Sequence, residues 1–597
     1  MGILVVEKWL YSVGTIHNFS IAYFQALDLQ IFPCCVAVSK KVVNSKMTIP
    51  DELFVLISSV SSGNGSTEDY ERICLILSNL STTELRSVFR KCDILKALMS
   101  INLQDKQSSQ IAMKLATIVF SLVPLFDFVQ SHEDELLLII ESTKFDLIEF
   151  ILKRLRVGAT EADCSVDNLP DRFLEAVARL VLHERLSIST EAQNFLITLG
   201  SKCPLGLKKV LGAPIIDTLK SSCTKPEHSI RVSEFAVHLA SVRPEIFQDV
   251  KNSGLLQPIL DGLSSRDPLV CLNWLELAKM LTDTQTGYQF LSEKDIFTRL
   301  MNDLRSFSSD SLADLLLPGY IAFFGNLAKH VPDYWLDDSN KGGGEGFKDI
   351  LANAVENKNI SISMTALETV GCIATTLAGR IALNRLFAND CAFRNVLSKL
   401  FLLISNSPSE ICTRAVGCYS FLLRRPGGVM VTDGLLDDAI RSLDWAVMSC
   451  QKGINTTPTT TTTTTEEKEA LVAPLLKRLY ALVTQPFFDV RVAVFKAIDA
   501  IATQPWGVRQ IIQQPGFFEY LLNRQTELGL TDKIQLMQAK LDIMNNMLKT
   551  FEAWNSSTYK AYNNLIGSDQ LKCIKVYIKE GLWGVVQTEA AVALEPG

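Results

Sequence analysis

Histidine and cysteine are the residue types in this 597-residue chain that would most readily build a metal or catalytic site, and their spacing builds neither. A zinc site needs three or four ligands at characteristic spacings, and the sequence has no Cys-x-x-Cys pair and no His-Glu-x-x-His motif. The six histidines are isolated from one another. His238 lies within an expected helix, and His132 and His183 lie at expected helix ends, so we interpret them as packed or solvated side chains. The sequence predicts no metal site.

Motifs for nucleophilic catalysis and phosphate binding are missing as well. No Gly-x-Ser-x-Gly elbow occurs, and no Gly-x-Gly-x-x-Gly turn follows a strand. The segment KGGGEG at 341–346 lacks the Lys-Ser/Thr pair of a phosphate-binding loop, and no predicted strand precedes it. We therefore predict a protein that is not an enzyme and that holds no cofactor. An enzyme with an unrecognised site is the alternative from another class.

The 14 cysteines are scattered singly, apart from the pair Cys34-Cys35. Most lie inside apolar helical runs, where reduced cysteine behaves as a small core hydrophobe. This usage fits a reducing compartment rather than a disulfide framework. We expect a cytoplasmic protein, with the nucleus as a second compartment.

Composition and charge narrow the class of partner. The chain is 47% hydrophobic and 21% charged with a net charge of −7, which is typical of a globular protein and argues against nucleic acid or an anionic membrane as partner. The most apolar stretch, residues 19–38, contains Asp28 and Pro33, and the N-terminus lacks the pattern of a signal peptide. We expect no membrane association.

The elements that organise the chain are copies of a nine-residue helical pattern. Residues 320–328 read YIAFFGNLA, 366–374 read ALETVGCIA and 494–502 read VFKAIDAIA. Apolar residues fall at i, i+3, i+4 and i+7, which is one face of an α-helix. Copies with the same apolar spacing begin at residues 193, 232, 274, 320, 366, 415 and 494.

The spacing of these copies predicts the fold. All steps except the last are 39–49 residues, close to the period of roughly 40–47 residues of HEAT and armadillo arrays. Glycine recurs thirteen residues after the start of several copies, and we interpret it as a turn residue that needs positive φ. The members of this glycine set are Gly206, Gly287, Gly379, Gly428 and Gly507. We predict an all-α fold, an α-solenoid coiled as a right-handed superhelix, with essentially no sheet.

Breaks in the pattern predict the organisation of the chain. We expect an N-terminal extension at 1–46 without the periodicity, an array at 47–454, a disordered Thr-rich insertion at 455–469, C-terminal repeats and capping helices at 470–583, and a frayed tail at 584–597. The last step, of 79 residues, is expected to contain the insertion together with one ill-defined repeat. One more repeat of uncertain phase is expected between 113 and 193.

Solenoids present a long concave surface to a partner, and in armadillo repeats the third helix lines it. The nine-residue pattern resembles that helix, so equivalent positions are candidates for partner contact. The candidates are His238, Met280, Asn326, Cys372 and Phe421. Burial between repeats is the competing interpretation for Met280, Cys372 and Phe421, and Asn326 could bond to a neighbouring repeat. A regular asparagine ladder is absent, which favours a folded protein partner over a basic peptide.

Two segments resemble a known family. Residues 317–328 read LPGYIAFFGNLA and residues 502–524 read ATQPWGVRQIIQQPGFFEYLLNR, and both are similar to the 26S proteasome non-ATPase regulatory subunit 5 family. The spans 229–250 and 267–297 fit the same order, so the resemblance covers about residues 50–580. The first 46 residues, the glycine-rich loop and the Thr tract lie outside it.

The resemblance implies a non-catalytic chaperone for assembly of the proteasome regulatory particle base. Such proteins hold the C-terminal domain of one ATPase subunit, together with a second ATPase and a large base non-ATPase subunit, and leave before the mature particle forms. On this resemblance the chain is expected to be a monomer on its own. A generic armadillo-type adaptor or transport receptor is the alternative among binding proteins.

Overall fold

The computed structural model describes most of the chain after residue 50. The described residues are 51–62, 65–101, 106–120, 125–161, 165–265, 267–307, 312–337, 346–425, 434–450, 465–529, 532–555 and 566–584. They fall into two compact units, Met1–Val123 and Pro124–Gly597, each considered by itself below. The predictions for residues 1–46 and for the tail from 585 onward lie outside the described ranges.

All regular structure in the described ranges is helical, so the predicted all-α class is confirmed there. The first unit contains α3 (Asp51–Ser61), α4 (Thr67–Ser78), α5 (Thr82–Lys91), α6 (Ile94–Ser100) and α7 (Lys106–Phe120). In the second unit the helices up to residue 263 are α8 (Leu125–Ser131), α9 (Glu133–Ile140), α10 (Phe145–Thr160), η1 (Val166–Asn168), α11 (Asp171–Leu180), α12 (Leu186–Lys202), α13 (Pro204–Val210), α14 (Ala213–Ser221), α15 (Pro226–Ala240), α16 (Pro244–Ser253) and α17 (Gln257–Leu263).

The second unit continues through the strongest part of the repeat pattern. Its next helices are α18 (Pro268–Thr282), α19 (Gln285–Ser292), α20 (Ile296–Ser306), α21 (Ala313–His330), α22 (Pro332–Trp335), α23 (Phe347–Val355), α24 (Ile360–Ile373), α25 (Leu377–Asn389), α26 (Cys391–Asn406) and α27 (Ser409–Leu423). The last are α28 (Gly434–Cys450), α29 (Thr465–Val483), α30 (Phe488–Ala502), α31 (Pro505–Gln513), α32 (Phe517–Leu522), α33 (Gln525–Leu528), α34 (Lys533–Asn555) and α35 (Ser568–Glu580).

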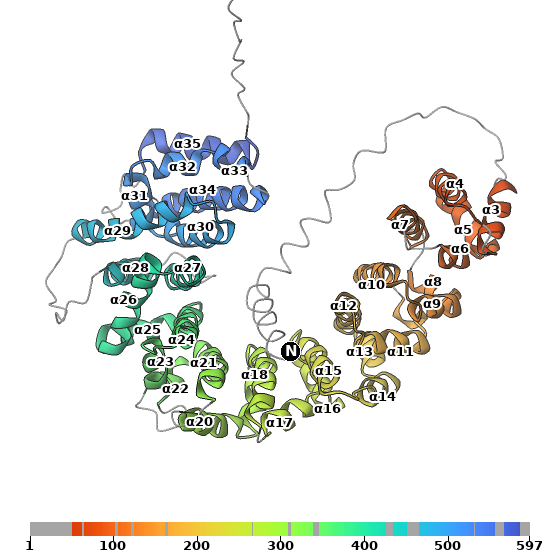
Figure 1. Ribbon diagram of the computed structural model, residues 1–597, viewed down its shortest axis with the longest axis horizontal. Coiled ribbons are helices and arrows are strands. Elements are labelled where there is room, and N and C mark those ends of the chain that lie inside the picture. Colours follow the sequence, from red (N-terminus) through yellow and green to blue (C-terminus); the bar gives the residue numbers. More distant parts are fainter. Residues whose placement is uncertain are drawn as a thin grey trace, which may run out of the picture. The chain divides into compact units, whose positions relative to one another are not determined.

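One set of helices in the second unit packs side by side in chain order, and we call these the row helices. They are α10, α12, α15, α18, α21, α24, α27, α30 and α34 (Figure 1). From α12 to α32, each row helix is followed by two helices that form a second layer. Helix-on-helix stacking of this kind is the architecture of HEAT and armadillo solenoids, so the predicted α-solenoid is confirmed. The handedness of its superhelix stays a prediction.

The nine-residue pattern marks the C-terminal end of each row helix. All seven copies from residue 193 onward end within two residues of the end of α12, α15, α18, α21, α24, α27 or α30. The repeat expected between 113 and 193 corresponds to α10, which packs on α12. Proline stands in the first turn of α15 and α18, where its missing N–H would have no partner in any case.

The recurring glycine works by close approach rather than by a positive φ, so our interpretation of it was wrong. Gly287 and Gly379 lie in the first turn of α19 and α25, outside the left-handed region. A Cβ on Gly287 would lie 2.0 Å from the Leu281 carbonyl oxygen, and one on Gly379 would lie 2.1 Å from that of Ile373. Only glycine lets the next helix begin so close to the end of a row helix. Gly428 lies outside the described ranges.

Within its described residues, the 79-residue step contains no additional row helix, contrary to our expectation. Helix α27 packs directly on α30, and the described residues between them include α28 and α29 of the second layer. The Thr-rich insertion is also shorter than expected, because α29 begins at Thr465 and Glu469 is already buried in it. Residues 451–464 lie outside the described ranges.

Aromatic residues fill the space between the two layers around α21. The rings of Phe324 and Trp335 lie 5.2 Å apart. The Phe324 ring also lies 5.7 Å from the tilted ring of Phe347 and 5.3 Å from the edge-on ring of Phe323. All four side chains are almost fully buried. Offset and edge-on ring pairs of this kind add about 0.5–1.5 kcal/mol each beyond the burial of their area.

Cations of one repeat also bind the carbonyl ends of helices in a neighbouring repeat. Lys209 Nζ donates to the Leu169 carbonyl at 2.6 Å, and Lys220 Nζ donates to the Ser253 carbonyl at 2.9 Å. The last carbonyls of a helix have no partner within it and carry the negative end of the helix dipole. These contacts therefore satisfy the helix ends and fix the distance between successive repeats.

Candidate partner-binding surface

The five candidate contact residues all lie on row helices of the second unit, one on each of five consecutive helices. They are His238 on α15, Met280 on α18, Asn326 on α21, Cys372 on α24 and Phe421 on α27. Their side chains differ in exposure. Asn326 is buried and Phe421 is exposed, whereas His238, Met280 and Cys372 are half-buried. Only Phe421 offers a large surface to a partner.

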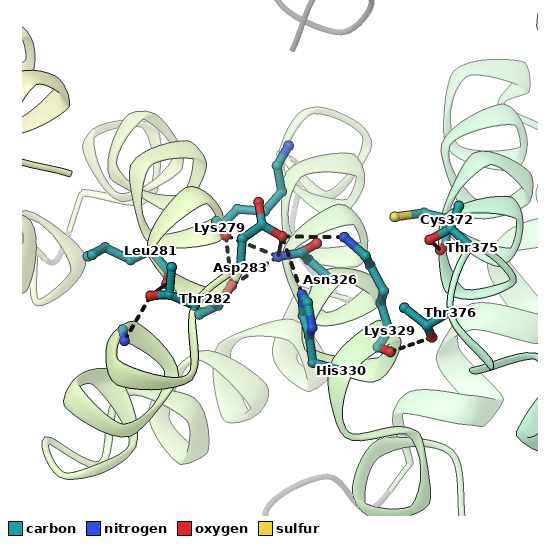
Figure 2. A network of polar contacts seen from close by, with 12 residues as sticks. Lys279, Leu281, Thr282, Asp283, Asn326, Lys329, His330, Cys372, Thr375 and Thr376 are labelled. Atoms are coloured by element: carbon teal, nitrogen blue, oxygen red, sulfur yellow. Dashed lines mark hydrogen bonds and ion pairs between the residues drawn. The ribbon is translucent and has the colours of Figure 1, made fainter. Parts of the chain in front are cut away.

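Asn326 joins two repeats. Its Nδ2 donates to the Lys279 carbonyl at 3.0 Å, to Thr282 Oγ1 at 3.0 Å and to Asp283 Oδ1 at 3.2 Å (Figure 2). The side chain is only 6% exposed. Its polar group is therefore satisfied by the end of α18, which is the structural alternative that the sequence had left open.

Asp283, which directly follows α18, gathers polar groups from α21. His330 Nε2 lies 3.3 Å from Asp283 Oδ1 and Lys329 Nζ lies 3.4 Å from the same atom (Figure 2). Partial burial raises the pKa of Asp283, but His330, Lys329 and Asn326 outweigh it and hold the pKa below its ordinary value. The carboxylate therefore stays ionised at neutral pH and ties α18 to α21.

Two residues from the next repeat also lie at this cluster: Cys372 of α24 and Thr376 at the start of α25. Thr376 Oγ1, at the N-cap of α25, donates to the Lys329 carbonyl at 2.8 Å. Burial raises the pKa of the Cys372 thiol, although Lys329 and Lys279 oppose the rise. A thiol held protonated is a poor nucleophile and a poor metal ligand. The cluster in Figure 2 is an inter-repeat joint rather than a site for covalent chemistry.

Two ion pairs connect the next row helices in the same way, from α27 to α24 and from α27 to α30. Arg414 of α27 binds both carboxylate oxygens of Glu368 on α24, with Nε–Oε1 of 2.7 Å and Nη2–Oε2 of 2.9 Å. Arg424, at the end of α27, binds Asp499 Oδ2 on α30 at 2.9 Å. Bidentate arginine–carboxylate geometry fixes orientation as well as distance. Phe421 lies between these two arginines along α27.

Sequence reasoning did not single out Gly417 of α27, which is half-buried, or Lys496 of α30, which is exposed on the neighbouring row helix. Gly417 lies in the middle of a strongly periodic helix, and an isolated glycine there is a recognisable signal for a special position. Lys496 carried no such signal, because a single lysine on a helix surface is normally solvated.

The sequence of this chain matches one protein family over most of its length. The family is described as Proteasome non-ATPase 26S subunit, and the match covers residues 52–428 and 470–597. The chain belongs to this family. The gap in the match contains the Thr-rich insertion and α28, the second-layer helix that precedes it.

Individual relatives of this proteasome subunit family carry a more specific name. The human 26S proteasome non-ATPase regulatory subunit 5 is 24% identical over 71% of this chain and 75% of its own length. The protein of the same name from Mus musculus is 23% identical over 71% of this chain and 75% of its own length. That from Drosophila melanogaster is 22% identical over 61% of this chain and 62% of its own length.

Solved structures similar to this family member are remote. Yeast importin-beta (Kap95p) aligns over 94% of this chain and 65% of its own chain with 12% identity and a TM-score of 0.44. An engineered protein aligns over 84% of this chain and 99% of its own chain, with 14% identity and a TM-score of 0.31. Scores at this level carry no inference about function.

The residues that carry the family resemblance near the C-terminus have structural roles. Trp506 is fully buried in α31, and its Nε1 donates to Ser442 Oγ of α28 at 3.2 Å. Gln504, which precedes α31, donates through Nε2 to the Leu423 carbonyl at the end of α27 at 3.4 Å. These side chains connect α27, α28 and α31, so their pattern identifies the family through its packing.

Within the described ranges, no single helix is long and apolar enough to cross a bilayer. The consecutive segments Gln107–Phe120 and Leu125–Ser131 reach that length and apolar character only together, and they are bent by 103° relative to each other.

Proposed function

We propose that this protein is a non-catalytic chaperone for assembly of the 26S proteasome regulatory particle base. It binds the C-terminal domain of an ATPase subunit and is released before the mature particle forms. Its partners are base ATPase subunits and a large base non-ATPase subunit, and it acts in the cytoplasm, with the nucleus as a second compartment. The observation that carries the proposal is the family match over residues 52–428 and 470–597.

The geometry supports a binding role. The joints between α18 and α30 use their polar groups internally, so the row is a scaffold whose outer side chains are available to a partner. Solenoid repeats commonly bind through such a face. A chaperone that covers the C-terminal domain of an ATPase would sterically delay its docking on the proteolytic core particle.

Affinity purification of the tagged full chain with quantitative mass spectrometry tests the proposal. We expect recovery of base ATPases and a large base non-ATPase subunit, without lid subunits and without the core particle. Recovery of transport cargo instead of proteasome subunits would favour the adaptor or transport-receptor alternative. Turnover of a substrate by the purified chain would favour an enzyme.

A matched pair of variants separates binding by the row from binding by the second layer. Phe421→Glu places a charge on α27 of the row, and Leu402→Glu does the same on α26 of the second layer. Both side chains are similarly exposed, at 46% and 43%, so neither change should lower the melting temperature appreciably. We expect Phe421→Glu to weaken recovery of the ATPase at least tenfold and Leu402→Glu to leave it unchanged. Equal effects of the two variants would exclude the row as the binding face.

A further inference from the structure

Helix α35 is the last helix in the described part of the chain, and one of its sides is exposed. It packs mainly against α34 and α32, and the side facing them buries Ile574 and Tyr577 (Figure 1). The opposite side is open along the helix. In a solenoid each repeat covers its neighbour, so the last repeat presents a side that the rest of the array does not cover.

Two large apolar side chains are exposed at this helix. Val576 and Trp583 are each 53% exposed, and Trp583 follows the end of α35 by three residues. The four other tryptophans of the described ranges are at most 7% exposed. Tryptophan carries a large apolar surface and is enriched where proteins make contacts. Trp583 is therefore the described tryptophan that is placed for a contact beyond the described structure.

Cations line the same exposed side of α35. Lys572, Val576 and Lys579 follow the spacing i, i+4 and i+7, which is one face of a helix. Lys575 lies beside them, three residues after Lys572. The ammonium group of Lys572 lies 3.6 Å from Asp569 Oδ1, and both side chains are largely exposed. Within the described ranges Lys575 and Lys579 make no hydrogen bond and no ion pair.

The carboxylates at this end of the described chain do not balance the lysines. Glu580 is bound by Arg524 at 3.2 Å, so α35 and Arg524 together carry four cations against two carboxylates. Apart from its buried lysine, α34 has two cations and two carboxylates, and α32 has one carboxylate. The three helices together with Arg524 are therefore net positive.

The chain continues from α35 with a segment of opposite charge. Residues 585–597 read VVQTEAAVALEPG, with Glu589 and Glu595 and without lysine or arginine. The other residues are mostly Val, Ala and Leu. Thirteen residues span up to about 43 Å when extended, whereas α35 with its 13 residues is about 20 Å long. The segment is therefore long enough to fold back over the whole helix.

We propose that the outer side of α35 is a docking site for the chain's own residues 585–597. The site, which we call the α35 face, is formed by Lys572, Lys575, Val576, Lys579 and Trp583. The carboxylates of Glu589 and Glu595 pair with the lysines of the α35 face. The apolar residues of the segment cover its valine and its tryptophan.

Docking of this segment caps the last repeat of the solenoid. Chain ends fray unless they are tied down, and the contact ties down the end that the sequence predicts to fray. Because the segment is tethered directly beside Trp583, its effective concentration at the α35 face is about 1 mM. A contact with a Kd of about 0.1 mM therefore keeps the face about 90% occupied.

Binding of the free segment to full-length chains tests this proposal by fluorescence anisotropy. The probe is a fluorescein-labelled peptide of residues 585–597. We expect it to bind the full-length variant Glu589→Lys/Glu595→Lys, whose own segment cannot pair with the lysines, at least tenfold more tightly than the wild-type chain, whose face is occupied. Equal binding to the two chains, whether tight or absent, would overturn the proposal.

Charge reversal on the α35 face locates the binding site. In the Glu589→Lys/Glu595→Lys chain, we expect Lys575→Glu and Lys579→Glu each to weaken the peptide at least fivefold. Lys208→Glu, on α13 of the second layer, is the matched control and should leave the affinity unchanged. All three lysines are exposed, so the changes should not lower the melting temperature appreciably. Peptide binding that both α35 changes leave intact would place the segment elsewhere and overturn the proposal.

Quenching of Trp583 fluorescence by acrylamide gives a measurement that needs no added peptide. The signal of Trp583 is the difference between a chain and its Trp583→Phe variant, and residues 585–597 contain no tryptophan. We expect the quenching constant of Trp583 to be at least twofold higher in the Glu589→Lys/Glu595→Lys chain than in the wild type. The same constant in both chains would show that the segment does not cover the ring, which would overturn the proposal.

Neither assay contains a proteasome component, so the results are independent of the proposed function. A chain that fails both assays but recovers base ATPases would remove this inference and leave the chaperone proposal standing. Docking of the segment in a chain that recovers no ATPase would leave the α35 face standing and remove the chaperone proposal.

Discussion

The side-chain amide of Asn326 donates a hydrogen bond to the backbone carbonyl of Lys279, 47 residues earlier in the chain, over 3.0 Å. The contact crosses from α21 to the last turn of α18, where carbonyls have no backbone N–H partner within their own helix. One asparagine thus provides the helix with a C-terminal hydrogen bond and sets the spacing of two repeats. Its neighbours Asp283 and Lys329 reinforce the same joint.

Replacing Asn326 with alanine should reduce stability rather than partner binding. The change removes one donor from the Lys279 carbonyl, which keeps the Thr282 hydroxyl, and one each from Thr282 Oγ1 and Asp283 Oδ1. We expect this loss to cost about 1–3 kcal/mol. Chemical denaturation of the variant measures the loss. Asn252→Ala on α16, where the amide makes one exposed contact with Gln248, should change the free energy of unfolding by less than about 0.5 kcal/mol. If the Asn326→Ala variant is as stable as the wild type but no longer binds the ATPase, Asn326 is a partner contact after all.

Asp283 gives the α18–α21 joint a pH dependence with a definite sign. Its pKa in the folded chain lies below the ordinary value of 3.8, so the folded state retains the ionised form to lower pH than the unfolded state. The stabilisation is therefore present above about pH 4 and is lost as the pH falls through the folded pKa. We expect Asp283→Asn to be less stable than wild type at pH 7, and the difference to shrink below pH 4. Denaturation midpoints at pH 7, 5, 4 and 3 test this, and a difference that grows toward acid would contradict it.

Periodicity predicted the row helices because the physics that defines them is local. An apolar stripe at helical spacing must be buried, and each copy of the pattern lies at the end of a helix packed on its neighbours. The role of the glycine thirteen residues into each copy could not be obtained in the same way. It depends on the distance between Gly287 and the carbonyl of Leu281 across a turn, which is a tertiary quantity.

The candidate surface was predictable only in part for a related reason. The repeat spacing placed Asn326, Cys372 and Phe421 at equivalent positions of their helices. The exposure of such a position, however, varies with the size of the residues on the adjacent helices. Asn326 is buried against the end of α18, and Phe421 is exposed although its Cβ packs near Gly371. A sequence shows which residues share a face and does not show how far apart two helices lie.

Two glycines of the row should respond to alanine with opposite signs. At Gly417 the added methyl meets open space, so Gly417→Ala should stabilise the chain by about 0.5–1 kcal/mol through helix propensity. At Gly325 it would lie 2.0 Å from Thr369 Cγ2, so Gly325→Ala should destabilise by about 1–3 kcal/mol because α21 and α24 must separate. Parallel denaturation of the two variants measures both effects. Destabilisation by Gly417→Ala would show a packing role for that glycine within the chain.

A buried charge cluster orders the C-terminal repeats. Lys540 of α34 is fully buried, and its Nζ donates to Glu527 Oε1 at 2.9 Å, to Thr526 Oγ1 at 2.6 Å and to the carbonyls of Tyr520 and Asn523 at 3.0 and 2.9 Å. Glu527, also fully buried, is bound by Arg491 of α30. Burial lowers the pKa of Lys540 to about 8, although Glu527 opposes the shift. Lys540 thus holds the chain between α32 and α34 against α30.

A double-mutant cycle on this cluster should show strong coupling. Lys540→Met removes the cation that pairs with the buried Glu527 carboxylate, so we expect a loss of about 3–5 kcal/mol, the range measured when one member of a buried pair is removed. Glu527→Gln should cost less, because the amide keeps the size of the side chain and its one oxygen still accepts from one of the two cations, although its NH2 group then faces the other. The double variant should be less destabilised than the sum of the two single variants by at least about 1 kcal/mol, since residues in direct contact are not independent. Additive losses would show that Lys540 stabilises the C-terminal repeats through its carbonyl contacts alone, with no contribution from its charge pair with Glu527.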